Sequence, residues 1–364
     1  MIRWTWVKIM GAVIAAGVLL SACILVQMPG RVVECNMPEA PVIIVDAPPP
    51  PPAPLPLPPT QCPWRFKEYI SSPYELEWEQ NIGAWQERVC ARMSDPDQIG
   101  KGDRWAEYVV ALNQNDRGIL GTNTTIDQIN EILSRFVYER ECDNATRLIY
   151  IEPIAGLTRH PYFCTRSRDL VVDKSYMLVD WAAAEYAKDA GEHAEHYYFD
   201  AGASSYTAGA GGASQGWIVD TYASRSIQFD DILAWEYTPM GAADIFAQIP
   251  AAVKPHYHWY NIPVSAVPAH PDNPITNIEA LCRQNDFVVF KIDIDTPSLE
   301  EPIVYELLNN THALSLVDEM FFEHHVDIPE MYPYWGGGMA ARLSDSYALF
   351  LRYRRAGVRI HSWV

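Results

Sequence analysis

Acidic and histidine side chains follow two apolar runs near the end of the chain. Asp293 and Asp295 end one run, and Glu323, His324 and His325 end the other. A histidine in such a place can act as general base toward a hydroxyl group. Carboxylates with an imidazole can instead hold a divalent metal ion. The third interpretation is that these polar groups only satisfy free amides at strand ends.

We take Glu323, His324, His325 and Asp293 as catalytic candidates, and Asp293 with Asp295 as candidate metal ligands. Adjacent residues of a strand point to opposite faces of a sheet. Asp293 and Asp295 should therefore share one face, and only one of the two histidines should join them.

A second group of residues is suited to an adenosyl cofactor. Asp200 and Gly202 follow a short aromatic run, and Glu236 ends the next apolar run, with a helical stretch between them. Glycine lets the backbone approach a ligand closely, and the N-terminus of the following helix presents free amides. A carboxylate at the second strand end can bind both hydroxyls of a ribose.

The elements that must position these groups alternate between strands and helices. Strand-like runs cover residues 197–199, 229–235, 256–264, 287–294, 316–326 and 358–364. Helical stretches cover residues 214–225, 243–249, 275–282, 302–309 and 344–356. This alternation predicts an α/β domain at residues 196–364, with a mostly parallel, Rossmann-like sheet and helices on both faces. Ligands of such sheets bind beyond the carboxyl ends of the strands.

Residues 62–195 precede this domain and should form a mainly helical region packed on it. Apolar residues recur at spacings of three and four in residues 74–92, 104–113 and 126–140, which predicts three helices. The segment at residues 150–161 mixes charge, histidine and glycine. We favour a structural role for this segment over contact with a substrate.

Three short motifs carry a family resemblance. They are YFDAGA at residues 198–203, AWE at residues 234–236 and FKIDID at residues 290–295. They resemble the V-D-x-G-A, A-F-E and K-I-D-x-E motifs of the FkbM-type family of class I S-adenosylmethionine-dependent methyltransferases. The match covers about residues 195–326. The segment around Glu152 and the tail at residues 357–364 also resemble uncharacterised membrane-anchored proteins of plants and algae.

This resemblance implies S-adenosyl-L-methionine as the cofactor. Asp200 and Gly202 would line its methionine end, and Glu236 would bind its ribose. Ser204 and Asp293 complete the expected cofactor-binding set. Ser204 stands where the family usually has Asn, and Asp295 stands where it has Glu.

The first 61 residues predict a membrane anchor and a stalk. A short N-terminus (residues 1–8) carries positive charge, and the uncharged segment at residues 9–27 reaches the ~18 residues needed to cross a bilayer. The charge asymmetry places the N-terminus in the cytoplasm. Residues 28–61 are Pro-rich and should form an extended stalk. The alternative is cleavage or lipidation at Cys23, because residues 20–23 resemble a lipobox.

Two further features agree with a location of residues 62–364 in the secretory-pathway lumen (Golgi or ER) or otherwise outside the cytoplasm. Glycosylation sequons begin at Asn123, Asn144 and Asn309. Beyond Cys23 the chain has an even number of cysteines, compatible with up to three disulfides; they are Cys35, Cys62, Cys90, Cys142, Cys164 and Cys282. The net charge of −19 argues against a nucleic-acid partner.

The function that we expect is methyl transfer to a sugar, glycan or other small hydroxylated acceptor. The first alternative is a type II membrane glycosyltransferase that uses residues 293–295 and a divalent metal. The second is a non-catalytic binding module that retains the methyltransferase fold.

Overall fold

The computed structural model describes residues 64–115, 124–140, 142–158, 163–165, 167–179, 194–209 and 212–363. The predicted anchor and stalk lie outside these residues. None of the helices formed by the described residues is long and apolar enough to cross a membrane.

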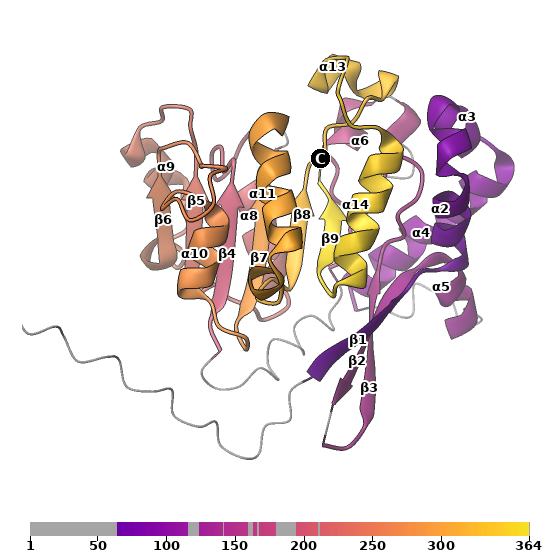
Figure 1. Cartoon of the computed structure of the whole chain (residues 1–364), viewed down its shortest axis with the longest axis horizontal. Coiled ribbons are helices and arrows are strands. Elements are labelled where there is room, and N and C mark those ends of the chain that lie inside the picture. The colour runs from indigo at the N-terminus through magenta and orange to yellow at the C-terminus, as the bar shows by residue number, and fades with distance from the viewer. Residues whose placement is uncertain are drawn as a thin grey trace, which may run out of the picture. The chain divides into compact units, whose positions relative to one another are not determined.

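The larger sheet has six parallel strands in the order β6-β5-β4-β7-β8-β9 (Figure 1). The strands are β4 His196–Ala201, β5 Asp231–Trp235, β6 Tyr257–Tyr260, β7 Phe287–Ile292, β8 Glu319–Phe322 and β9 Arg359–Ser362. The chain runs outward from β4 to β6 and then crosses to β7 on the other side of β4. The predicted α/β, Rossmann-like fold is confirmed, and the strand order reverses between β4 and β7, where such folds bind ligands.

The central strands are apolar because helices cover both of their faces. All six residues of β7 are buried, as are all but the first of β4, which is typical of parallel strands. Figure 1 shows α10, α11 and α14 in front of the sheet and α8 behind it. The helices of this domain are α8 Ser214–Ala223, α9 Ala242–Gln248, α10 Pro274–Leu281, α11 Pro297–Asn309, α12 Thr311–Leu314, α13 Tyr332–Trp335 and α14 Leu343–Arg355. Two short 3-10 turns, η3 Lys254–His256 and η4 Pro329–Met331, complete it.

Two element boundaries at the site differ from the sequence prediction. β7 ends at Ile292 rather than at residue 294, because the chain turns there and Asp295 has a φ of 57°. α11 begins at Pro297 rather than at residue 302, and proline is favoured in a first helical turn, where its missing amide costs nothing.

The N-terminal region contains a three-stranded antiparallel sheet that the sequence analysis missed. Its strands are β1 Trp64–Ile70, β2 Ser134–Arg140 and β3 Ala145–Ile151. The predicted helix at residues 126–140 is wrong beyond Ile132, because the backbone is already extended at Leu133. The side chains of Phe136 and Tyr138 are buried in a cluster with residues of β3. Aromatic residues of this kind favour strands.

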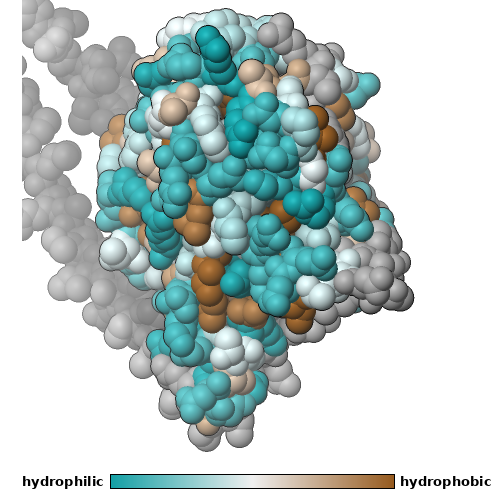
Figure 2. All heavy atoms as spheres, turned by 90° about the vertical axis from the view of Figure 1, so that its right-hand side faces the viewer, coloured by the Kyte–Doolittle hydropathy of each residue, from teal (hydrophilic) through white to brown (hydrophobic). Residues whose placement is uncertain are grey.

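Helices account for most of the remaining N-terminal structure. They are α2 Pro73–Trp85, α3 Val89–Met93, α4 Pro96–Asn113, α5 Ile126–Ile132 and α6 Arg168–Val171, with 3-10 turns η1 Gln86–Arg88 and η2 Phe163–Thr165. Figure 2 shows that hydrophilic residues dominate the side of the molecule at the right of Figure 1, with apolar residues in small groups. Scattered apolar residues of this kind are normal on a solvent-exposed face.

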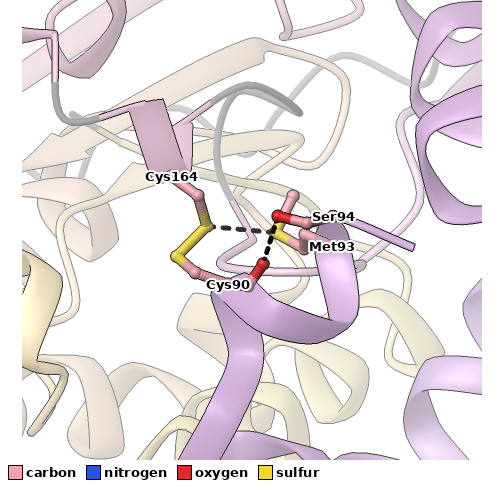
Figure 3. Close-up of a disulfide and its surroundings, with 4 residues drawn as sticks. All are labelled: Cys90, Met93, Ser94 and Cys164. Atoms are coloured by element: carbon pink, nitrogen blue, oxygen red, sulfur yellow. Dashed lines mark hydrogen bonds between the residues drawn. A yellow bond between two sulfur atoms is a disulfide. The ribbon is translucent and has the colours of Figure 1, made fainter. Parts of the chain in front are cut away.

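A disulfide between Cys90 and Cys164 joins α3 to η2 (Figure 3). Cys282 is a buried free thiol. The disulfide closes a loop with a sequence separation of 74 residues. It also fixes the chain shortly before α6, whose Val171 borders the cleft described below.

Buried ion pairs connect the N-terminal region with the α/β domain. Arg354 of α14 lies 3.2 Å from Glu75 and 3.4 Å from Glu152. His361 of β9 lies between two carboxylates, 2.8 Å from Glu152 and 2.8 Å from Glu319. These contacts give Glu152 the structural role that we favoured for residues 150–161, and they explain why the C-terminal tail is polar but buried.

Candidate functional site

A cleft of about 760 Å³ opens at the carboxyl ends of the parallel strands, across the reversal between β4 and β7. It is bordered by most of the site residues predicted from the sequence: Gly202 and Ser204 after β4, Glu236 after β5, Asp293 and Asp295 after β7, and Glu323 after β8. The structure therefore brings the two groups of the sequence analysis into one cavity.

The carboxylate of Glu236 is held in place by two backbone amides. Its Oε2 accepts a hydrogen bond from the amide of Ser204 at 2.8 Å, and its Oε1 accepts one from Thr238 at 2.6 Å. A carboxylate oxygen has a second lone pair, so both oxygens can still accept a hydrogen bond from a ligand. Ser204 thus contributes to the site through its backbone, in a left-handed conformation with a φ of 53°.

The structure shows a further reason why position 202 must be glycine, besides the approach of a ligand. Its φ is 86°, and an added Cβ would lie 1.6 Å from the carbonyl oxygen of Asp293. The glycine therefore permits the close approach of the chain after β7, in addition to lining the cleft.

Asp200 is fully buried and is not among the described residues that line the cleft. Its Oδ1 accepts a hydrogen bond from the Lys291 ammonium at 3.0 Å. The same ammonium bonds the carbonyl of Gly202 at 3.1 Å and lies 3.4 Å from Asp293. Burial lowers the pKa of Lys291, but the carboxylates of Asp200 and Asp293 raise it above its usual range. Asp200 therefore acts through Lys291 to hold the turns after β4 and β7 together.

Asp295 and Glu323 border the cleft, and His325 lies beside them, although it is not among the described residues that line the cleft. The Nε2 of His325 lies 3.1 Å from Glu323 and 3.8 Å from Asp295. Burial lowers the pKa of His325, but its hydrogen bond to Glu323 and the nearby carboxylates raise it overall. Trp335 of α13 covers this group, with its ring centroid 4.8 Å from that of His325 and its indole N–H donated to Glu323 at 3.0 Å.

Asp293 has partners of its own, different from those of Asp295. Its Oδ2 accepts a hydrogen bond from the indole of Trp363 at 3.1 Å and faces Lys291. Burial and the neighbouring Glu323 raise the pKa of Asp293 well above its usual range. Among the described residues, the group with metal-ligand spacing joins Asp295 to Glu323 and His325, not to Asp293. Because β7 stops at Ile292, strand alternation does not govern these two aspartates.

His324 lies away from this group. Its ring stacks on Phe322 at 5.1 Å, and its Nδ1 has no hydrogen-bond partner in the part of the chain that the structure describes. Burial lowers the pKa of His324 to about 4, so it is neutral at physiological pH. One histidine of the pair, His325, lies with Asp295 and Glu323, but both histidines follow the end of β8 at Phe322, so strand alternation is not the reason.

Four residues near the site were not identified as site residues from the sequence: Lys291, Glu300, Trp335 and Trp363. Glu300, in the first turn of α11, accepts a hydrogen bond from the amide of Ile294 at 2.7 Å. Burial raises the pKa of Glu300 to about 7. Lys291 and Trp363 have partners far away in the sequence, Asp200 and Asp293 respectively. Glu300 and Trp335 have nearer partners, Ile294 and Glu323. The position of Lys291 within the FKIDID motif offered a signal.

No protein-family model matches the chain, and comparison with curated proteins and solved structures found no match either. The function is therefore inferred from the site itself.

Proposed function

We propose that this chain is an S-adenosylmethionine-dependent methyltransferase that acts on a hydroxyl group of a sugar, glycan or other small acceptor. The observation that carries the proposal is the carboxylate of Glu236, fixed by two amides at the end of β5 and bordering a cleft at the strand-order reversal. In doubly wound folds, an acidic residue at this place binds ribose hydroxyls.

The residues around Glu236 suit the rest of an adenosyl group. Tyr237 is 72% exposed and borders the cleft together with Ile262 and Pro263, which follow β6. An aromatic ring and apolar side chains beside a ribose-binding carboxylate offer stacking surface to a flat base.

The charge of the cleft favours a cationic cofactor. The carboxylates of Glu236, Asp295 and Glu323 border it, and none of the described lining residues is Lys or Arg. S-adenosylmethionine carries a positive sulfonium beside its reactive methyl group, whereas a nucleoside diphosphate would meet uncompensated repulsion.

The group around His325 supplies the acid–base chemistry. S-adenosylmethionine provides an activated methyl group when it is bound. An acceptor hydroxyl placed beside His325 would give its proton to the imidazole as its oxygen attacks the methyl carbon. Glu323 orients the imidazole and stabilises the imidazolium that results, as the 3.1 Å contact between them allows.

A second candidate is supported by one observation, the spacing of Asp295, Glu323 and His325. Such a group could hold the metal of a glycosyltransferase, and the ion would neutralise the phosphates of a nucleotide sugar. This candidate needs no adenosyl site at Glu236.

Isothermal titration of the full-length chain distinguishes the two candidates. We expect one molecule of S-adenosylhomocysteine to bind without added metal, because the ribose site uses only protein groups. UDP-sugar binding that requires Mn²⁺, with no binding of S-adenosylhomocysteine, would refute the methyltransferase proposal and support the glycosyltransferase.

A further inference from the structure

We infer that Asp295, Glu323 and His325 form a binding site for one divalent metal ion at the part of the cleft that Asp295 and Glu323 border. The inference rests on the geometry and charge of the cleft, and it stands or falls independently of methyl transfer. It assigns His325 as a ligand whenever the ion is bound.

The three side chains have suitable atoms at suitable distances. One ligand atom from each lies within 4.8 Å of the other two. Metal–ligand bonds of ~2.1 Å place two ligand atoms ~3.0 Å apart at a right angle and ~4.2 Å apart on opposite sides of an ion. The separations of 3.1 Å and 3.8 Å from the His325 Nε2 fall within that range.

The three ligands differ in how far they are buried. The side chains of Glu323 and His325 are 8% and 4% exposed, whereas that of Asp295 is 74% exposed. Two ligands are thus held in place by their surroundings. The third lies on the open side, where it can close the remaining distance to an ion and where an ion can enter.

The charge around the group is an independent reason to expect a cation. Glu236 borders the same cleft as Asp295 and Glu323. The Lys291 ammonium is engaged by Asp200 and Asp293, and the imidazole of His325 is shared by Asp295 and Glu323. A divalent ion would offset the negative charge that Asp295 and Glu323 bring together here.

Residues around the ligands are arranged as in metal sites, where outer groups orient the inner ones. Trp335 donates its indole N–H to the Oε1 of Glu323, while Oε2 faces His325. Two carboxylates with a single imidazole suit Mn²⁺ better than the nitrogen- and sulfur-rich sets of zinc. Three protein ligands leave positions open toward the cleft for hydroxyl oxygens of an acceptor.

The test is a titration of the full-length chain with Mn²⁺. Binding is measured as the loss of the electron paramagnetic resonance signal of free Mn²⁺. We expect one ion to bind per chain, and both Asp295→Asn and His325→Gln to weaken binding at least tenfold. His324→Gln is the matched control, since His324 is next in the sequence but faces away from the group, and it should bind Mn²⁺ as the wild type does.

Two results would overturn the inference: no Mn²⁺ binding by wild-type protein at millimolar concentration, or unchanged binding in both ligand variants. Circular dichroism of each variant ensures that loss of binding is not loss of folding. S-adenosylhomocysteine is titrated in parallel. Metal binding without S-adenosylhomocysteine binding would refute the proposed function alone, and the reverse result would refute the metal site alone.

Discussion

Individual side chains in this cleft depend on partners that lie far along the chain. Glu236 is fixed by the amide of Ser204, and Asp293 by the indole of Trp363. The sequence could identify Glu236 and His325 because each follows an apolar strand. It could not identify Trp363, because the contact with Asp293 exists only once β9 has joined the sheet beside β8.

Replacing Lys291 by Met should destabilise the protein strongly. The change leaves Asp200 and Asp293 buried without their shared cation, and breaking a buried pair in this way costs about 3–5 kcal/mol in the free energy of unfolding. Urea denaturation measures the loss. Lys254→Met, at an exposed position, is the control and should change stability by less than ~0.5 kcal/mol. A loss below ~1 kcal/mol for Lys291→Met would show that the ion pair is not what holds the strand ends.

Replacing Gly202 by Ala should also be severely destabilising, because the new Cβ would lie 1.6 Å from the carbonyl oxygen of Asp293. The backbone that follows β7 must shift, and we expect a loss of more than ~3 kcal/mol in the free energy of unfolding. Gly83→Ala in α2 is the matched control, since nothing lies within 4 Å of its added Cβ; it should be neutral or stabilise by up to ~1 kcal/mol. Equal melting temperatures for the two variants would contradict the close approach of the two strand ends.

At the scale of elements, alternation predicted the six parallel strands and the helices between them. It failed at residues 134–140, because Phe136 and Val137 continue the spacing of three and four residues that begins at Ile132 and Leu133. The distinction depends on pairing with β1 and β3. β2 begins 64 positions after β1 ends (134 against 70), whereas β3 follows β2 after a short turn. Tertiary pairing of this kind overrides a local pattern.

The disulfide between Cys90 and Cys164 should stabilise the region that borders the cleft at α6. Changing both cysteines to Ser should lower the free energy of unfolding by about 2–4 kcal/mol, because the unfolded chain regains the freedom of a long loop. Denaturation with and without dithiothreitol measures this. If the reductant destabilises the double variant as much as the wild type, the effect does not come from this bond.

At the scale of the whole molecule, a buried network joins the N-terminal region to the α/β domain. His361 lies between Glu152 and Glu319, Arg359 pairs with Glu319 at 2.7 Å, and Arg354 pairs with Glu75. Sequence analysis singled out the segment around Glu152 and the C-terminal tail, but it gave no reason to place them together. The membrane anchor at residues 9–27 and a lumenal position of the body remain predictions.

This network should make stability depend on pH. Burial lowers the pKa of His361, but Glu152 and Glu319 raise it overall above its usual value. A raised folded-state pKa means that the stabilisation is fully present below the unfolded value of ~6.5 and is lost as pH rises through the folded-state pKa. A neutral imidazole can donate a hydrogen bond to only one of the two carboxylates, Glu152 or Glu319, so deprotonation of His361 removes one of these contacts.

The free energy of unfolding should therefore fall between about pH 6.5 and alkaline pH. His361→Gln should be less stable at pH 6 and should show a flatter pH dependence than the wild type. The difference between the two proteins removes the contribution of His325, whose pKa is also raised. Parallel pH profiles would mean that His361 is not the titrating group.

The most direct test of the account is the affinity of S-adenosylhomocysteine for the wild type and for Glu236→Gln, measured by isothermal titration on the full-length chain. The change removes a charged acceptor for two ribose hydroxyls, and charged hydrogen bonds contribute about 1.5–3 kcal/mol each. We predict binding at one site in the wild type and at least ~10-fold weaker binding in the folded variant. Equal affinities for the two proteins, or no binding by the wild type, would contradict the assignment of this cleft to an adenosyl cofactor.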